Sequence, residues 1–340
     1  MKDIIEMVAL SRIKGISPSQ KKDLVEGRLD NRIWRDALKG FKDFESIEAE
    51  LKALKDIGAD VITINDAEYP VLLKNISDPP LVLYRKGRLP PGGIYISIVG
   101  SRKATFEGIG VSEKMASTLS SLGVTIVSGL ARGIDSAAHR GALTGKGKTV
   151  AVLGSGIDVC YPSENLWLYK KICEEGAVVS EYGMGVKPLP FHFPERNRII
   201  AGLSRGVIVI EASARSGSLI TARLGLEYNR DVMAIPGSIF NEEHKGANRL
   251  IKEGARLIEN IEDIISLYLP DLTSTLKDKN TIDMDEDESY IYSFIGHERT
   301  HIDDVIEKSN REAKNVLAII TRLELKEAIR QFPGGFYLRN

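Results

Sequence analysis

Short apolar runs alternate with helical patterns between residue 92 and about residue 268. Each run is apolar throughout, without the polar alternation of a strand that faces water on one side. Such runs are typical of parallel strands covered by helices on both faces. The pattern predicts a doubly wound α/β domain with a mostly parallel sheet. The expected strands are Ile94–Val99, Val124–Val127, Thr149–Leu153, Ala177–Val179, Val207–Ile210 and Val232–Ile235, and the expected helices include Val111–Leu122, Ala137–Leu143 and Leu219–Tyr228.

The segment before this domain reads as short helices, with apolar positions at helical spacing over residues 1–62. We expect a small helical domain of the SAM or helix-hairpin-helix type. The turn Ile13–Pro18, followed by Lys21 and Lys22, either joins two helices or presents backbone N–H groups to a phosphate. Prolines exclude long helices over residues 61–91, where we expect an extended connector packed on the next domain.

The last part of the chain begins with an acidic stretch and ends in a compact pattern. Residues 283–288 are nearly all acidic, which is typical of a solvated linker. Three helical patterns and a hairpin around Pro333–Gly335 then predict a winged-helix-like unit. The expected divisions are 1–62 for the helical domain, 63–268 for the core, 269–288 for the linker and 289–340 for the winged-helix-like domain.

Positive and negative charges nearly cancel, since 46 Lys and Arg residues stand against 47 Asp and Glu. A uniformly basic surface is excluded, so any polyanion site has to be a local patch. Residues 92–268 carry 20 basic and 18 acidic side chains, whereas residues 270–340 carry 10 and 14. We therefore expect a protein-contact or regulatory role for the acidic C-terminal unit, although Arg311, Lys314 and Asn315 could line one face of its recognition helix.

Several functional classes receive no support from the sequence. No apolar run approaches the roughly 18 residues of a membrane span. The first residues carry acids and no small-residue cleavage site, which argues against a secretory signal. Cys160 and Cys173 are not spaced as a metal or redox pair. We expect a cytoplasmic protein with no metal, no cofactor and no membrane partner.

Glycine and serine follow nearly every expected strand, and three of these loops add an arginine. Small residues let the backbone approach a ligand closely, and exposed backbone N–H groups attract anions. The arginine guanidinium group can donate two parallel hydrogen bonds to a phosphate. Because the carboxyl ends of parallel strands meet at one edge of a sheet, these loops predict a ligand that carries phosphate. The loops are Gly100–Arg102, Ser128–Gly133, Gly154–Asp158, Glu211–Ser218 and Pro236–Ser238.

Two nucleotide-binding motifs are incomplete in this chain. Gly154-Ser155-Gly156 lacks the third glycine of the dinucleotide fingerprint, because Val159 stands there. Gly147-Lys148-Thr149 resembles the end of a P-loop, but Ala142 replaces the earlier glycine and a strand follows instead of a helix. Dinucleotide and ATP binding by these routes are excluded.

A second basic segment, Phe191–Arg198, combines two aromatic rings, a histidine and two arginines. Bases can stack on such rings while arginine neutralises the backbone. Alternatively, Phe191 and Phe193 only fill the edge of the sheet. Lys245–Asn248 adds another cation and an amide.

Support for catalysis is weaker. Glu181, Glu211, Asp135 and His139 lie near expected strand ends and could transfer protons. No nucleophile elbow, metal-ligand spacing or paired-carboxylate motif accompanies them. Asp135 is interpreted as a helix cap and His139 as a packing residue, so we do not expect an enzyme.

Several motifs together resemble one bacterial family, the DNA-processing protein A (DprA/Smf) family. The resemblance extends from about residue 65 to residue 260. It rests on Tyr69-Pro-x-Leu-Leu, Asp78-Pro-Pro-x-x-Leu-Tyr84, Gly100-Ser-Arg102, Ser128-Gly-Leu-Ala-Arg-Gly-Ile-Asp135-x-x-Ala-His139, Phe193-Pro-x-Arg-Asn-Arg-Ile-Ile-Ala-Gly-Leu-Ser204, Arg215-Ser-Gly-Ser-Leu-Ile-Thr-Ala222, Val232-x-Ala-Ile-Pro-Gly237 and Gly246-x-Asn-x-Leu-Ile251.

The resemblance implies an extended Rossmann-like core that binds single-stranded DNA without hydrolysis or redox chemistry. It also implies protection of incoming DNA in natural transformation, help in loading the RecA recombinase, and a homodimer formed through the core. The family's pocket uses the Gly100–Arg102 loop. A lysine that relatives carry after the Tyr-Pro motif is absent here, since Ser163 and Glu164 follow Tyr161-Pro162, and Lys170 or Lys171 would have to substitute.

The residues themselves suggest how such a site would bind DNA. Arg102 would pair with a phosphate or stack on a base, Arg196 and Arg198 would extend the cationic track, and the turn at Ser216–Ser218 would offer N–H groups. Ile251 and Leu257 are expected dimer contacts. The full set of expected DNA-binding residues is Gly100, Ser101, Arg102, Arg132, Arg196, Asn197, Arg198, Ser216, Gly217, Ser218, Thr221, Lys245 and Asn248.

The principal alternative is an enzyme on the same fold, a nucleoside monophosphate phosphoribohydrolase-like protein that cleaves nucleotides. Such enzymes share a Pro-Gly-Gly-x-Gly-Thr-x-x-Glu signature. The nearest stretch here, Ser216–Thr221, lacks those glycines and the glutamate. A second alternative is a scaffold for RecA with only weak DNA contact.

Overall fold

The computed structural model describes residues 4–270, 284–296, 299–326 and 328–339. Its contacts divide the chain near residue 264 into two units, each of which is described on its own. Most of the expected linker lies outside the described residues, because residues 271–283 are among those not described.

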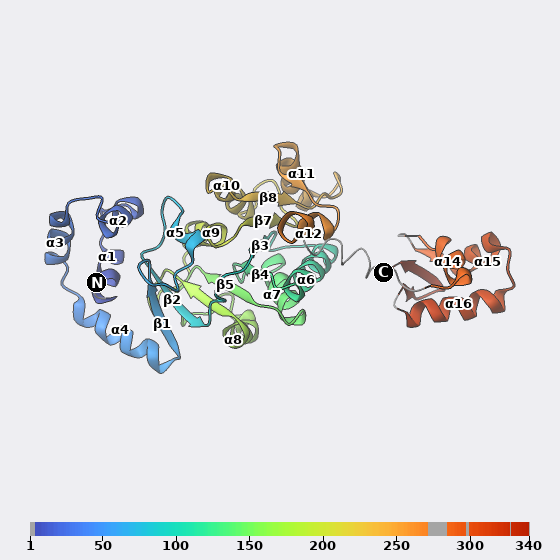
Figure 1. The fold of residues 1–340 in the computed structure, drawn as a ribbon, viewed down its shortest axis with the longest axis horizontal. Helices are drawn as coiled ribbons and strands as arrows, with labels where there is room; N and C mark the ends of the chain where they lie inside the picture. Colours follow the sequence, from blue (N-terminus) through green and yellow to red (C-terminus); the bar gives the residue numbers. More distant parts are fainter. Residues whose placement is uncertain (1–3, 271–283, 297–298, 327, 340) are drawn as a thin grey trace. The chain divides into compact units, whose positions relative to one another are not determined.

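The N-terminal region is helical, as the apolar spacing predicts (Figure 1). Ser17 caps the second helix of this region. The Lys21 ammonium donates to the Ser11 carbonyl at 2.8 Å, and that of Lys22 donates to the Ile76 carbonyl at 3.0 Å. Both lysines are thus bound within the chain, which favours the helix connector over a phosphate-binding turn. The helices are α1 (Ile4–Arg12), α2 (Pro18–Val25), α3 (Asn31–Lys39) and α4 (Phe44–Asp56).

A nine-stranded sheet forms the centre of the first unit, in the order β1-β2-β6-β5-β4-β3-β7-β8-β9. The parallel part contains every strand predicted from the apolar runs, and all of their residues except Asp231 are buried. The parallel strands are β3 (Tyr95–Val99), β4 (Thr125–Ser128), β5 (Thr149–Leu153), β6 (Ala177–Ser180), β7 (Gly206–Val209), β8 (Asp231–Ala234) and the unpredicted β9 (Arg256–Leu257).

The proline-rich segment contributes two antiparallel strands where we expected only an extended connector. β1 (Ala59–Thr63) pairs with β2 (Val82–Gly87), and β2 pairs with β6. The short helix α5 (Val71–Lys74) lies between them along the chain. The backbone hydrogen bonds of β2 satisfy the otherwise unpaired edge of β6. This pairing joins segments far apart in the sequence, so the spacing of the prolines does not predict it.

Helices cover both faces of the sheet, as a doubly wound fold requires (Figure 1). On one face lie α6 (Phe106–Ser121), α7 (Ile134–Thr144) and α8 (Leu166–Glu175). On the other lie α9 (His192–Leu203) and α10 (Ser218–Glu227). The chain proceeds outward from β3 through β4 and β5 to β6, and then returns to place β7 beside β3. The strand order therefore reverses between β3 and β7. Short helices η1 (Ser163–Asn165), η2 (Glu242–His244) and α11 (Lys245–Lys252) lie in connections, and α12 (Glu262–Tyr268) spans the boundary between the units.

The C-terminal unit has the winged-helix-like order of elements that the sequence predicts. Ile291, Val316, Ile320 and Leu323 belong to its own buried core. Its sheet has the order β10-β12-β11, with a short strand β10 that the apolar pattern did not predict. Its elements are α14 (Glu286–Ser293), β10 (Thr300–His301), α15 (Ile302–Ser309), α16 (Ala313–Leu325), β11 (Ile329–Phe332) and β12 (Phe336–Arg339).

Candidate nucleic-acid-binding cleft

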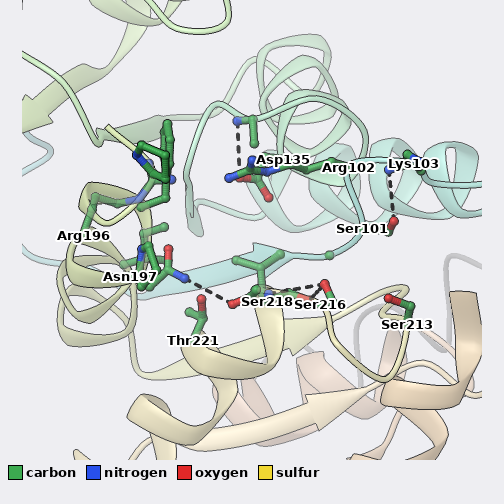
Figure 2. A pocket seen from close by; sticks show the side chains of 18 of the residues that line it. Ser101, Arg102, Lys103, Asp135, Arg196, Asn197, Ser213, Ser216, Ser218 and Thr221 are labelled. Atoms are coloured by element: carbon green, nitrogen blue, oxygen red, sulfur yellow. Dashed lines mark hydrogen bonds between the residues drawn. The ribbon is translucent and has the colours of Figure 1, made fainter. Parts of the chain in front are cut away.

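A cleft of about 570 Å³ opens at the carboxyl ends of β3 and β7, where the strand order reverses (Figure 2). Open α/β sheets bind ligands at this switch point, because the loops of the two flanking strands diverge there. The cleft brings together residues that the sequence predicted separately. These residues are Gly100, Ser101, Arg102, Arg196, Asn197, Ser216, Gly217, Ser218 and Thr221.

The loop after β3 is held tightly against its neighbours. The Ser101 N–H donates to the Glu211 carbonyl at 2.7 Å, and the Ser101 hydroxyl accepts from the Lys103 N–H at 3.0 Å. A Cβ atom on Gly100 would lie 2.8 Å from the Glu211 carbonyl oxygen, so only glycine fits. The anchored backbone leaves the side chains of Arg102 and Lys103 exposed at the cleft.

Arg102 lies beside two aromatic rings. Its guanidinium carbon is 5.0 Å from the centre of the Phe193 ring, and that ring lies 5.6 Å from the ring of Tyr161. Phe193 and Tyr161 both line the cleft, whereas Phe191 is 56% exposed and does not line it. The three side chains form a continuous cation-and-aromatic surface of the kind on which a base can stack.

Arg196 lies at the base of the cleft and is almost completely buried, with 3% of its surface exposed. It donates to the Gly129 carbonyl at 2.8 Å and to the Val152 carbonyl. Burial lowers the pKa of Arg196 to about 10, against the attraction of Asp135. Arg196 therefore links the loop after β4 to the end of strand β5 at the base of the cleft.

Asp135 is buried next to Arg196, and burial raises the pKa of its carboxyl group. The carboxylate accepts from the N–H groups of Gly129 at 3.2 Å and Ala131 at 3.3 Å. The prediction that Asp135 caps α7 is wrong, because Gly133 occupies the N-cap position. The carboxylate lies inside the first turn and binds the loop that leads into the helix.

The loop after β7 forms the opposite wall of the cleft (Figure 2). The Asn197 side-chain amide donates to the Gly217 carbonyl at 3.2 Å, and the Ser216 and Ser218 hydroxyls lie 2.7 Å apart. Ser218 begins α10, so the first N–H groups of that helix lie at this wall. The positive end of the helix dipole favours an anion in this position.

The remaining predicted residues do not line the cleft. Arg198 is buried and contacts the carboxylates of Glu181 and Asp78 at 2.5 and 3.4 Å. Lys245 pairs with Glu242 at 2.5 Å. The Asn248 side chain donates to the Gly237 carbonyl at 2.9 Å and accepts from its N–H at 3.1 Å. Arg132 borders a smaller adjoining pocket, where it pairs with Glu164.

Sequence reasoning did not assign several residues that line the cleft. Lys103 directly follows Arg102 in the same loop, so its position next to a predicted binding residue could have identified it. Tyr161, Asp135, Ser213 and Glu243 line the cleft as well. Glu243 lies far along the chain, in a short helical turn, and no sequence pattern marks it.

Glu211 and His139, the other proposed proton-transfer residues near strand ends, have structural contacts. Glu211 is 1% exposed and accepts from the Thr105 N–H at 2.9 Å and from the Thr105 hydroxyl. His139 is fully buried, and its Nδ1 lies 2.7 Å from the Thr149 hydroxyl. The packing role predicted for His139 is confirmed.

The fold and the cleft define a doubly wound α/β protein with cations and aromatic rings at its switch point, together with a winged-helix unit. Residues 60–269 match the family model for DNA recombination-mediator protein A. Residues 276–335 match the model for the DprA winged helix domain. The chain therefore belongs to the DNA recombination-mediator protein A family, as the motifs indicated.

Individual relatives agree with this assignment. The chain is 38% identical to Protein Smf from Escherichia coli over 303 residues, which cover 86% of this chain and 80% of that protein. DNA processing protein DprA from Streptococcus pneumoniae is 49% identical over 207 residues, covering 61% of this chain and 73% of that protein.

Two solved structures share the fold. The X-ray structure of DNA processing protein A from Streptococcus pneumoniae gives a TM-score of 0.68 at 37% identity, covering 79% of this chain and 99% of that one. The structure of DNA processing protein A from Helicobacter pylori, which concerns that protein's single-stranded DNA binding mode, gives 0.56 at 30% identity, covering 63% and 96%. Among the described residues, none of the helices is long and apolar enough to cross a membrane.

Proposed function

We propose that the cleft binds single-stranded DNA without altering it. The observation that carries this proposal is the side chain of Arg102, which contacts the Phe193 ring and forms no ion pair among the described residues. Phosphate can approach its guanidinium group, while a base can reach the neighbouring ring. The N–H groups at Ser218 and the Lys103 ammonium supply further anion contacts on the same cleft.

The aromatic surface favours a single strand over a duplex. A base can stack on Phe193 or Tyr161 only if it is not already stacked within a paired helix. Contacts to phosphates and ring faces carry little information about base identity. Binding is therefore expected to be largely independent of sequence and to weaken as salt rises.

The resemblance to characterised relatives supports finer roles. We propose that the protein protects incoming DNA and helps to load the RecA recombinase onto it. A homodimer through the core would use the half-buried Ile251 and the exposed Leu257, which is 40% exposed on edge strand β9. Light scattering tests the dimer, and the rate of RecA filament nucleation on single-stranded DNA, with and without this protein, tests the loading.

The nucleotide-cleaving alternative has less support from the cleft. The two buried carboxylates near the β3 loop, Asp135 and Glu211, are occupied by backbone N–H groups and by Thr105. Incubation with nucleoside monophosphates, followed by chromatography for free base, distinguishes the two functions. Release of base at a rate that depends on the protein would support the enzyme.

Fluorescence anisotropy with a labelled oligo-dT tests the binding proposal. Arg102→Ala is expected to raise the Kd roughly tenfold at physiological salt, since it removes a charged hydrogen-bond donor. Arg223→Ala is the matched control, because it removes an equally charged side chain that pairs with Glu227 and does not line the cleft. An unchanged Kd for Arg102→Ala would overturn the proposal.

A further inference from the structure

The side chains of Arg132 and Glu164 form a two-pronged ion pair at the border of the cleft. Nε and Nη2 of Arg132 lie 2.7 Å from Oε1 and Oε2 of Glu164, one contact for each carboxylate oxygen. Both side chains are more than half exposed, at 59% and 54%. The hydrogen bonds with Arg132 lower the pKa of the Glu164 carboxyl group, so the carboxylate is charged at neutral pH.

The backbone on both sides of this pair is anchored. Glu164 belongs to η1, and the side-chain amide of the next residue, Asn165, donates to the Leu130 carbonyl at 2.9 Å and to the Ser136 hydroxyl at 2.8 Å. Asn165 therefore ties the Glu164 turn to the loop that carries Arg132. The fold itself therefore places the Glu164 carboxylate opposite the Arg132 guanidinium group, and the pair does not depend on side-chain flexibility alone.

The pair lies next to the proposed path of the DNA. Arg132 borders a small pocket whose lining includes Arg102, Tyr161 and Phe193, and these three residues also line the main cleft. A strand that contacts Arg102 and stacks on Phe193 therefore passes close to Arg132. The planar fork of arginine binds a carboxylate and a phosphate with the same geometry, so the two anions compete for it.

We propose that Glu164 is a built-in competitor of the DNA backbone, which occupies Arg132 in the free protein and lowers the affinity of the cleft for single-stranded DNA. This inference rests on the proposed function of the cleft. An exposed ion pair is weak, so a phosphate can displace Glu164 at small cost. The displaced carboxylate still repels the strand, and the protein therefore binds more loosely and releases DNA more readily than the same cleft with a neutral residue at position 164.

Anisotropy titrations of the full-length protein with oligo-dT at several salt concentrations test this inference. Glu164→Gln keeps the size of the side chain and removes its charge. It is expected to lower the Kd roughly three- to fivefold, because the phosphate no longer has to displace a carboxylate from Arg132. The slope of log K against log salt should steepen by up to about 0.7, because the phosphate bound by Arg132 is no longer offset by a freed carboxylate. Arg132→Ala alone is expected to change the Kd less than twofold.

The double variant Arg132→Ala/Glu164→Gln separates competition for Arg132 from a general charge effect. It restores the net charge of the natural protein, and its Kd is expected to return to within about twofold of the natural value. Glu227→Gln is the matched control, because Glu227 is also paired with an arginine, is 55% exposed and does not line the cleft. Its Kd is expected to stay unchanged.

Three results would overturn the inference, and they can be told apart. If the natural protein binds oligo-dT and Arg102→Ala raises the Kd, but Glu164→Gln leaves the Kd unchanged, only the proposed role of Glu164 fails. If the double variant keeps the full gain, Arg132 is not the contested group and the competition model fails. If the natural protein does not bind oligo-dT at all, the proposed function fails and this inference falls with it.

Discussion

The Arg102 guanidinium lies over the ring of Phe193, with 5.0 Å between its central carbon and the ring centre. Arg102 comes from the loop after β3, and Phe193 comes from the first turn of α9, so the contact joins two walls of the cleft. The pairing holds the cation where phosphate can reach it and keeps one ring next to it for a base.

The ring of Phe193 should contribute measurably to DNA affinity. Phe193→Leu keeps apolar volume but removes the stacking surface, and we expect oligo-dT binding to weaken by about 1 kcal/mol or more, roughly fivefold. Phe41→Leu, which changes a half-buried ring outside the cleft, is the control for loss of an aromatic side chain. Equal affinities of Phe193→Leu and the natural protein in anisotropy titrations would argue against stacking.

Arg196 should matter more for stability than the exposed arginines do. Arg196→Met removes the donor to the Gly129 and Val152 carbonyls and leaves Asp135 buried without its cation, which should cost about 3–5 kcal/mol of unfolding free energy. Arg249→Met, at an exposed pair, should cost less than about 1 kcal/mol.

Urea denaturation measures both variants. Adding Asp135→Asn to Arg196→Met should recover part of the loss, because the buried uncompensated charge disappears. Strictly additive losses in the double variant would show that Arg196 and Asp135 do not interact.

Two glycines of the cleft should respond differently to alanine. A Cβ atom at Gly100 would lie 2.5 Å from the Ile134 side chain and 2.8 Å from the Glu211 carbonyl oxygen, whereas one at Gly217 would meet nothing within 4 Å. Gly100→Ala should lower stability by about 1–3 kcal/mol and weaken DNA binding by displacing the Arg102 loop. Gly217→Ala should leave stability nearly unchanged in the same denaturation assay, and a loss equal to that of Gly100→Ala would contradict the packing argument.

Stability should fall in mild acid partly because of His139. Burial, with the nearby Arg196 charge, lowers the pKa of His139 from its usual 6.5 to about 3. Below pH 6.5 the unfolded chain therefore binds a proton that the folded chain does not. The contribution is complete above about pH 6.5 and is lost progressively toward pH 3, with a slope of up to about 1.4 kcal/mol per pH unit.

His139→Asn tests this pH dependence. The Thr149 hydroxyl donates to the Ile126 carbonyl and accepts from the histidine Nδ1, and the asparagine amide can replace that donor without titrating. Unfolding free energies of this variant, measured by urea denaturation from pH 7 to pH 5, should fall less steeply than those of the natural protein. Parallel curves would assign the acid sensitivity to other groups.

Removal of the C-terminal unit should leave the cleft intact. The unit has its own buried core, and residues 270–340 carry 10 basic against 14 acidic side chains, a poor balance for binding a polyanion. A protein that ends at residue 270 should therefore bind oligo-dT with a Kd within about twofold of the full chain. A tenfold weaker Kd would give the winged-helix unit a direct part in DNA binding.

Much of the fold could be read from local pattern, because a strand buried on both faces has to be apolar throughout. Every predicted run from Ile94–Val99 to Val232–Ile235 became a strand of the sheet, with ends shifted by a residue at most. β1 and β2 were not predicted, since their place at the sheet edge depends on pairing with β6. Proline content limits helix length but does not choose a pairing partner.

The chain by itself determined which residues could serve an anion site: the loops with Gly, Ser and Arg at strand ends, and the aromatic segment at Phe193. Tertiary structure alone decided which of these charges are available. Arg198 forms ion pairs with Glu181 and Asp78, and Arg132 forms one with Glu164. Among the described residues, Arg102 forms no ion pair and contacts the ring of Phe193. The reason is physical: residue type and spacing fix what a side chain can bind, but the partner that neutralises a charge comes from a distant segment, which only the folded chain brings within reach.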